Sequence, residues 1–313
     1  MPPYASLPRD GDGVATAWGL FGEDDSLGRL NLIDEAVVVA AARLVRRGVS
    51  FGLDAALDTF RPPLDVTRSL HAHRVLVPAG DASEDLDDVV DNLFLQISSQ
   101  WDSLAHVAAR PGVFYNGRSV ADVLERGRNT IDHWSRRGVV TRGLLLDVAR
   151  VSSRDPTGRG GAITVEELEA ARTAHSLTYS AGCAIVIRTG FLSWYRSLGP
   201  DERAALSQDL VAPGVEHTEE MAQYLWDSGA AAVATDTFAL EVWPPDFSDQ
   251  ARPFGFLHRV LIGQFGFAIG ELWDLEALAA DCARDAVYEF LLASAPLHVR
   301  GAVGSPANAL AVK

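Results

Sequence analysis

Four polar residues with even numbers are the first candidates for chemistry in this sequence. Gln96, Gln100, Asp102 and His106 lie within the run from Leu95 to His106. Residues two apart point to the same face of an extended strand, so a strand from Gln96 to Asp102 would present two amides and a carboxylate together. The alternative is a polar strand face that ends in a loop.

His258 and Glu271 bound a second candidate segment. If a short helix follows His258 and a strand carries residues 268–270, the imidazole and the carboxylate could converge from opposite ends. Seen in isolation, the same residues also fit a histidine at a helix end and a glutamate on the surface. His71 and His73 have a spacing found in metal sites, but a solvated pair explains it equally simply.

Common motifs of nucleotide-binding and hydrolytic enzymes are missing from the chain. The sequence contains no P-loop, no GxGxxG after a strand, no HExxH and no GxSxG. Its two cysteines, Cys183 and Cys282, form no CxxC pair. Nothing therefore predicts a disulfide framework or a thiolate zinc site.

The elements that must position the candidates alternate between strand and helix. Strands are expected at 51–57, 68–77, 93–99, 139–151, 183–190 and 230–236, and helices at 35–47, 119–137 with a break at Gly127, 218–228, 258–265 and 275–284, with a further short helix opened by a capping box at 164–167. This alternation predicts an α/β protein. We expect a flexible N-terminal arm at 1–15, one catalytic domain at 16–313, and a solvated acidic loop from Pro78.

Charge and hydropathy exclude several classes of function. The 313 residues include 42 acidic and 27 basic residues, which gives a formal charge of −15. Such a surface repels phosphate backbones and anionic lipid, so we expect neither nucleic-acid nor membrane binding. No apolar run is long enough to span a bilayer, and the start lacks the pattern of a signal peptide. A cytoplasmic protein is the simplest interpretation.

Several short segments, taken in order, resemble the cyclase family that includes bacterial kynurenine formamidase and isatin hydrolase. They begin with Trp18-Gly19 and the run from Gly22 to Asn31, similar to a family opening GxxDxxGxxN. Later segments are Arg142 to Asp147, Arg188-Thr-Gly190, Thr235-Asp236-Thr237 with Glu241, His258 to Glu271, and Ala295 to Pro306. The resemblance implies a compact α/β domain of the swivelling β/β/α type, with a β-barrel-like central sheet flanked by helices.

The family's metal motif, H-x3-H-x-D-x3-H followed later by a His and a Glu, falls on the candidate residues. The resemblance implies that Asp102, His258 and Glu271 bind metal and that His106 is the general acid/base. Gln96 and Gln100 stand where the two early histidines are expected, as weak ligands or substrate contacts. An amide oxygen is a poorer ligand than imidazole for zinc, so we expect one divalent ion, manganese or zinc.

The resemblance implies hydrolysis of an amide or lactone bond, often cyclic, in a small aromatic metabolite. Two alternatives stay open: a ring-forming cyclase or dehydratase of secondary metabolism, and a catalytically silent small-molecule-binding protein. Trp18, Trp101, Tyr115 and Asn116 are expected to line the substrate pocket, although ordinary packing explains them too. A homodimer or homotetramer is the expected assembly.

Overall fold

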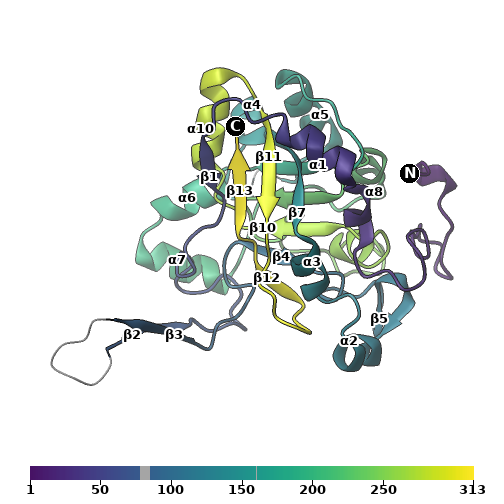
Figure 1. The fold of residues 1–313 in the computed structure, drawn as a ribbon, viewed down its shortest axis with the longest axis horizontal. Helices are drawn as coiled ribbons and strands as arrows, with labels where there is room; N and C mark the ends of the chain where they lie inside the picture. The colour runs from purple at the N-terminus through teal and green to yellow at the C-terminus, as the bar shows by residue number, and fades with distance from the viewer. Residues whose placement is uncertain (78–84, 160) are drawn as a thin grey trace.

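A curled sheet of nine strands forms the centre of the protein in this computed structural model, which describes residues 1–77, 85–159 and 161–313 (Figure 1). In spatial order the strands are β1 (Ser50–Gly52), β13 (Ala309–Val312), β11 (Glu289–Ser294), β7 (Val139–Asp147), β8 (Ala184–Arg188), β9 (Ala232–Thr235), β10 (Ala268–Glu271), β4 (Gln100–Asp102) and β12 (Gly304–Pro306). The predicted mixed α/β domain is confirmed, and its barrel-like sheet is a half-barrel.

Four parallel strands, β7, β8, β9 and β10, make the middle of this sheet. Their sequences are nearly continuous apolar runs, as expected for strands with both faces covered. The connections between them carry the helices α4 (Val148–Ser152), α5 (Val165–Ala174), α6 (Phe191–Ser197), α7 (Pro200–Gln208), α8 (Glu219–Asp227) and α9 (His258–Leu261). Antiparallel strands extend the sheet on both sides.

Local capping signals define several helices. Thr164 forms the predicted capping box of α5 with Glu167, and Asp34 caps α1 (Glu35–Ala42). Gly127, in the left-handed conformation at φ 62°, ends α2 (Val120–Arg126) before α3 (Asp132–Arg137), so the predicted break is confirmed. The last helix is α10 (Glu276–Asp285).

The strand predicted at 93–99 is wrong, because this segment forms turns and bends. Its serine side chains bond to neighbouring backbone: Ser98 Oγ donates to the carbonyl of Ala56 and Ser99 Oγ to that of Leu272. These contacts, to residues 42 and 173 positions away, tie the segment to two distant parts of the chain. Regular pairing begins only at Gln100.

A hairpin of β2 (Ala72–Leu76) and β3 (Asp87–Asp91) projects away from the central sheet and its helices (Figure 1). Most of the predicted loop that starts at Pro78 falls at 78–84, outside the described residues. A second small hairpin pairs β5 (Val113–Phe114) with β6 (Arg118–Ser119). No helix in the described part of the chain is both long and apolar enough to cross a membrane.

The first residues, expected to form a flexible arm, lie against α8 in this structure. The Tyr4 amide donates to Asp227 Oδ1 at 2.7 Å, and the Tyr4 hydroxyl donates to Glu219 Oε1 at 2.7 Å. The indole of Trp226 donates to the carbonyl of Pro2. The arm is thus docked on its own chain here.

Gly214 lies where two backbone segments touch, and we predict that Gly214→Ala destabilises the fold. A Cβ on Gly214 would lie 2.2 Å from the carbonyl carbon of Glu241, a backbone atom that cannot rotate away. Overpacking of this kind costs about 1–3 kcal/mol, which a lower midpoint of thermal unfolding would reveal. Gly52→Ala is the matched control, because its Cβ would meet open space. Equal midpoints for both variants would contradict the prediction.

Candidate metal centre

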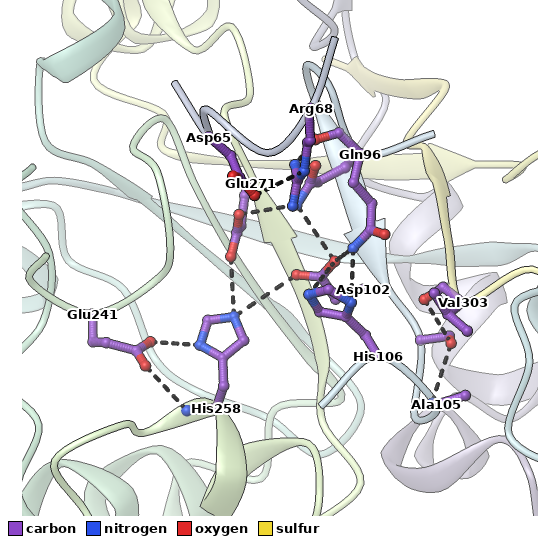
Figure 2. Close-up of polar contacts among 12 residues, drawn as sticks. Asp65, Arg68, Gln96, Asp102, Ala105, His106, Glu241, His258, Glu271 and Val303 are labelled. Atoms are coloured by element: carbon purple, nitrogen blue, oxygen red, sulfur yellow. Dashed lines mark hydrogen bonds and ion pairs between the residues drawn. The ribbon is translucent and has the colours of Figure 1, made fainter. Parts of the chain in front are cut away.

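Three predicted ligands, distant in sequence, meet in the interior of the protein. His258 Nε2 lies 3.0 Å from Glu271 Oε1 and 3.7 Å from Asp102 Oδ2 (Figure 2). All three residues are buried, and their ligand atoms lie within 4.8 Å of one another. The expected convergence of one imidazole and two carboxylates therefore occurs in the structure.

Strand pairing brings the carboxylates together. In the antiparallel pair of β4 and β10, Gln100 stands opposite Glu271 and Asp102 opposite Ile269. Because side chains alternate across a strand, Gln100, Asp102 and Glu271 share one face of the sheet. His258 reaches the same point from the first turn of α9. The three residues of β4 are therefore enough to place Gln100 and Asp102 beside Glu271.

Both glutamines contact the carboxylates, as hydrogen-bond donors. Gln96 Nε2 donates to Asp102 Oδ1 at 2.5 Å, although Gln96 lies in a turn instead of the expected strand. Gln100 Nε2 donates to Glu271 Oε2 at 3.0 Å. Each amide therefore satisfies one oxygen of a neighbouring carboxylate.

The residues present fit a divalent metal ion. Asp102 Oδ2 and Gln100 Oε1 are buried and find no hydrogen-bond partner among the described residues. A buried carboxylate oxygen without a donor costs free energy unless a cation or a proton meets it. One imidazole nitrogen and two carboxylate oxygens form a ligand set that zinc or manganese accepts.

Burial and neighbouring charges shift the pKa values of all three residues in the cluster. Burial and the charge of Asp102 raise the pKa of Glu271 above its usual range. Burial also disfavours the Asp102 charge, but His106 and His258 outweigh it and lower the pKa of Asp102. Burial likewise opposes the charge of His258, yet the surrounding carboxylates, led by Glu241, raise the pKa of this imidazole. Protonation of Glu271 and His258 is therefore favoured over its usual extent.

Glu241 holds His258 from the side opposite the other ligands. Its Oε2 lies 2.7 Å from His258 Nδ1, and its Oε1 accepts the His258 backbone N–H at 3.1 Å. A carboxylate on Nδ1 fixes the tautomer that leaves Nε2 free to bind metal. The ring of Phe256 stacks on the imidazole, with centroids 5.1 Å apart and planes 11° apart. The orientation of His258 is therefore set by two independent contacts.

His106 lies next to the cluster and remains accessible. Its Nε2 is 3.7 Å from Asp102 Oδ1, its Nδ1 is 3.0 Å from Gln96 Nε2, and its side chain is 26% exposed. Burial lowers the pKa of His106, and the positive charges of His258 and Arg68 lower it further, against the opposing effect of Asp102. A largely neutral imidazole at this position is able to accept a proton.

The four residues predicted to line a substrate pocket make other contacts in the structure. The prediction is wrong for Trp101, which alternates with Gln100 and Asp102 and so faces the opposite side of β4. There it packs edge-on against Trp134 and Trp273 in the core. Trp18, Tyr115 and Asn116 join the N-terminal loop instead: Trp18 Nε1 donates to the carbonyl of Gly263, the Tyr115 hydroxyl to Asp25, and Asn116 Oδ1 accepts from the Gly19 amide.

Sequence reasoning missed the roles of Glu241 and Arg68. Glu241 was noted only as part of a family-like segment, and its bond to His258 spans 17 residues. Arg68 reaches the carbonyl oxygen of Gln96 from 28 residues away. Neither pairing has a local sequence signal, because each depends on how separate loops fold over the sheet.

Comparison with known proteins identifies the family. Residues 64–242, more than half of the chain, match the sequence model of the cyclase family. A crystal structure described as a novel cyclase is 32% identical, with 95% of this chain and 99% of that chain covered and a TM-score of 0.84. The chain belongs to the cyclase family. The matched range includes Gln96 to His106 and Glu241, and the structural match extends the likeness over most of the remaining chain.

Isatin hydrolases share the fold of this cyclase-family chain. Isatin hydrolase A from Ralstonia solanacearum is 20% identical, with 89% of this chain and 96% of that chain covered and a TM-score of 0.56. An isatin hydrolase bound to the product analogue thioisatinate is 14% identical, with 89% and 98% covered and a TM-score of 0.60. A search of curated protein sequences gives no match.

We predict that Glu241→Gln weakens binding of Mn²⁺ or Zn²⁺ by about 10–100-fold, the usual effect of losing a carboxylate behind a metal-binding histidine. Glutamine keeps an acceptor for His258 Nδ1 but removes the charge. Isothermal titration of the metal-free protein measures the affinity. Glu289→Gln, which removes a surface carboxylate paired with Arg142, is the control, and equal affinities in the two variants would disprove the role of Glu241.

Proposed function

We propose that this cyclase-family protein is a metal-dependent hydrolase that opens an amide or lactone bond, often cyclic, in a small aromatic molecule. One observation carries the proposal: Asp102, His258 and Glu271 converge beside the His106 imidazole, and Asp102 Oδ2 accepts no hydrogen bond from the described residues. Cations and proton-transfer groups are placed together in this way where carbonyl groups are hydrolysed.

Each residue of the cluster has a distinct task in this proposal. Asp102, His258 and Glu271 hold one divalent ion, Mn²⁺ or Zn²⁺, and Gln100 Oε1 is a neutral oxygen available beside them. The ion, when bound, lowers the pKa of a water molecule and polarises the carbonyl of the substrate. Glu241 keeps the Nδ1 proton of His258 in place, so Nε2 stays free.

His106 moves the proton. Its imidazole is held next to Asp102 with a lowered pKa, so at neutral pH it accepts a proton from the attacking water. The water oxygen joins the carbonyl carbon, the bond from that carbon to nitrogen or oxygen breaks, and His106 returns the proton to the leaving atom. The acceptor nitrogen of His106 is Nδ1, which faces Gln96 Nε2, so taking up the proton requires this contact to open.

Two observations support the proposed substrate class. Isatin hydrolases, by their name, act on isatin, an aromatic cyclic amide, and they share this fold. Phe256 places an aromatic ring directly on His258. A homodimer or homotetramer remains our proposal for the assembly.

Metal analysis of three variants tests the proposal. Asp102→Ala and His258→Ala should lose bound Mn²⁺ or Zn²⁺ by elemental analysis, because each removes a ligand. His106→Ala should keep the ion and lower turnover by about 10²–10⁴-fold, the usual contribution of a general acid/base. Isatin and dihydrocoumarin serve as the cyclic amide and lactone probes.

The same experiment separates the alternatives. Hydrolysis in ¹⁸O-labelled water places the label in the product carboxylate, whereas ring formation or dehydration does not. Wild-type protein without stoichiometric metal, and with activity unaffected by chelator, would remove the metal mechanism. Normal turnover by His106→Ala would show that another group transfers the proton.

We predict that metal affinity rises with pH between 6 and 8. In the metal-free protein, the pKa values of His258 and Glu271 are raised, so both groups hold protons at pH 6. Metal must displace these protons, and it competes better as pH increases. Titration calorimetry in two buffers of different ionisation enthalpy counts the released protons. An affinity independent of pH would contradict the assignment of these ligands.

A further inference from the structure

Arg68 brings a positive charge to the edge of the cluster from a distant segment. Its Nη1 donates to the carbonyl oxygen of Gln96, and its Nε lies 3.2 Å from Asp65 Oδ2. The side chain of Gln96 in turn contacts Asp102 and His106. The guanidinium is therefore separated from both groups by a single residue (Figure 2).

The charge of Arg68 acts on the groups that the proposed reaction uses. Burial lowers the pKa of His106, and Arg68 lowers it further. At Glu271, Arg68 opposes the burial that raises the pKa of this carboxyl. The positive charge of Arg68 is therefore close enough to affect both His106 and Glu271.

Arg68 uses only some of its N–H groups to bond to Gln96 and Asp65. A guanidinium carries five N–H donors in a planar fork. Nε faces Asp65 and Nη1 faces Gln96, while Nη2 makes no hydrogen bond to any of the described residues. The side chain is 16% exposed, so it is largely desolvated yet reachable. A planar fork with a free edge is suited to a carboxylate, which binds it through two parallel hydrogen bonds.

We propose that Arg68 binds a carboxylate of the substrate, which is then a small aromatic amide or lactone that bears an acid group. The inference rests on the proposed function, because it takes the cluster of Asp102, His258 and Glu271 as the reaction centre. The chain carries a formal charge of −15, and its buried carboxylates would repel such an anion. Arg68 offsets this repulsion, whereas a neutral substrate gains nothing from a desolvated cation.

Benzoate and benzamide, which have the same shape and different charge, test this proposal. Their affinities for metal-loaded protein are measured by ligand-observed NMR for wild type, Arg68→Gln and Arg61→Gln. We expect Arg68→Gln to weaken benzoate binding by about tenfold, the scale of one charge-assisted hydrogen bond, and to leave benzamide within about twofold. Arg61 is the matched control: it precedes β2 as well, but its side chain is 52% exposed and pairs with Asp58.

Metal content, measured on each variant, distinguishes failure of this inference from failure of the proposed function. Absence of metal from wild type would remove the proposed hydrolase, while a loss of benzoate binding specific to Arg68→Gln would still assign the anion site. If Arg68→Gln weakens both probes equally, loses the ion, or binds benzoate like wild type, the inference is overturned. Equal losses of benzoate binding in Arg68→Gln and Arg61→Gln would overturn it as well.

Discussion

Three buried carboxylates share one imidazole at the centre of this protein, and the rest of the site depends on how their charge is balanced. Asp102, Glu241 and Glu271 all lie within hydrogen-bond or ion-pair distance of His258. A single imidazolium cannot neutralise three carboxylates in a poorly solvated space. Burial and the neighbouring charge of Asp102 raise the pKa of Glu271, so protons held in the cluster relieve part of the repulsion. A divalent ion would balance the same charges without those protons.

The half-barrel sheet holds these charged side chains in place by packing the other face of the same strands tightly. Pairing of β4 with β10 places Gln100 and Glu271 side by side, while the alternate residues Trp101 and Gly270 face the core. Gly270 has room for no side chain, since a Cβ would lie 2.8 Å from Ala234 and 2.9 Å from the Trp273 ring. One strand pair thus carries a dense apolar layer on one face and the ligands on the other.

Local rules predicted most of the fold, whereas the candidate ligand set came from the resemblance to the cyclase family. Apolar runs mark the parallel strands, and the period of two places Gln100 and Asp102 on one face. Applied to Trp101, that period would have assigned it to the core. The prediction of a strand at 93–99 was wrong, because the serines of this segment bond to backbone that is distant in sequence. The contacts of Glu241 and Arg68 could not be predicted from the sequence, since they form only when separate loops fold over the sheet.

In the proposed metal centre, the two glutamines limit how many ions the carboxylates can bind. An imidazole at either position would offer a lone pair to a second ion, whereas each amide here donates an N–H to a carboxylate. Asp102 Oδ1 and Glu271 Oε2 are thereby occupied by donors, which weakens them as ligands for a second cation. Asp102 Oδ2, Glu271 Oε1 and His258 Nε2 remain directed toward one another. In the proposed metal centre, this arrangement favours one ion over two.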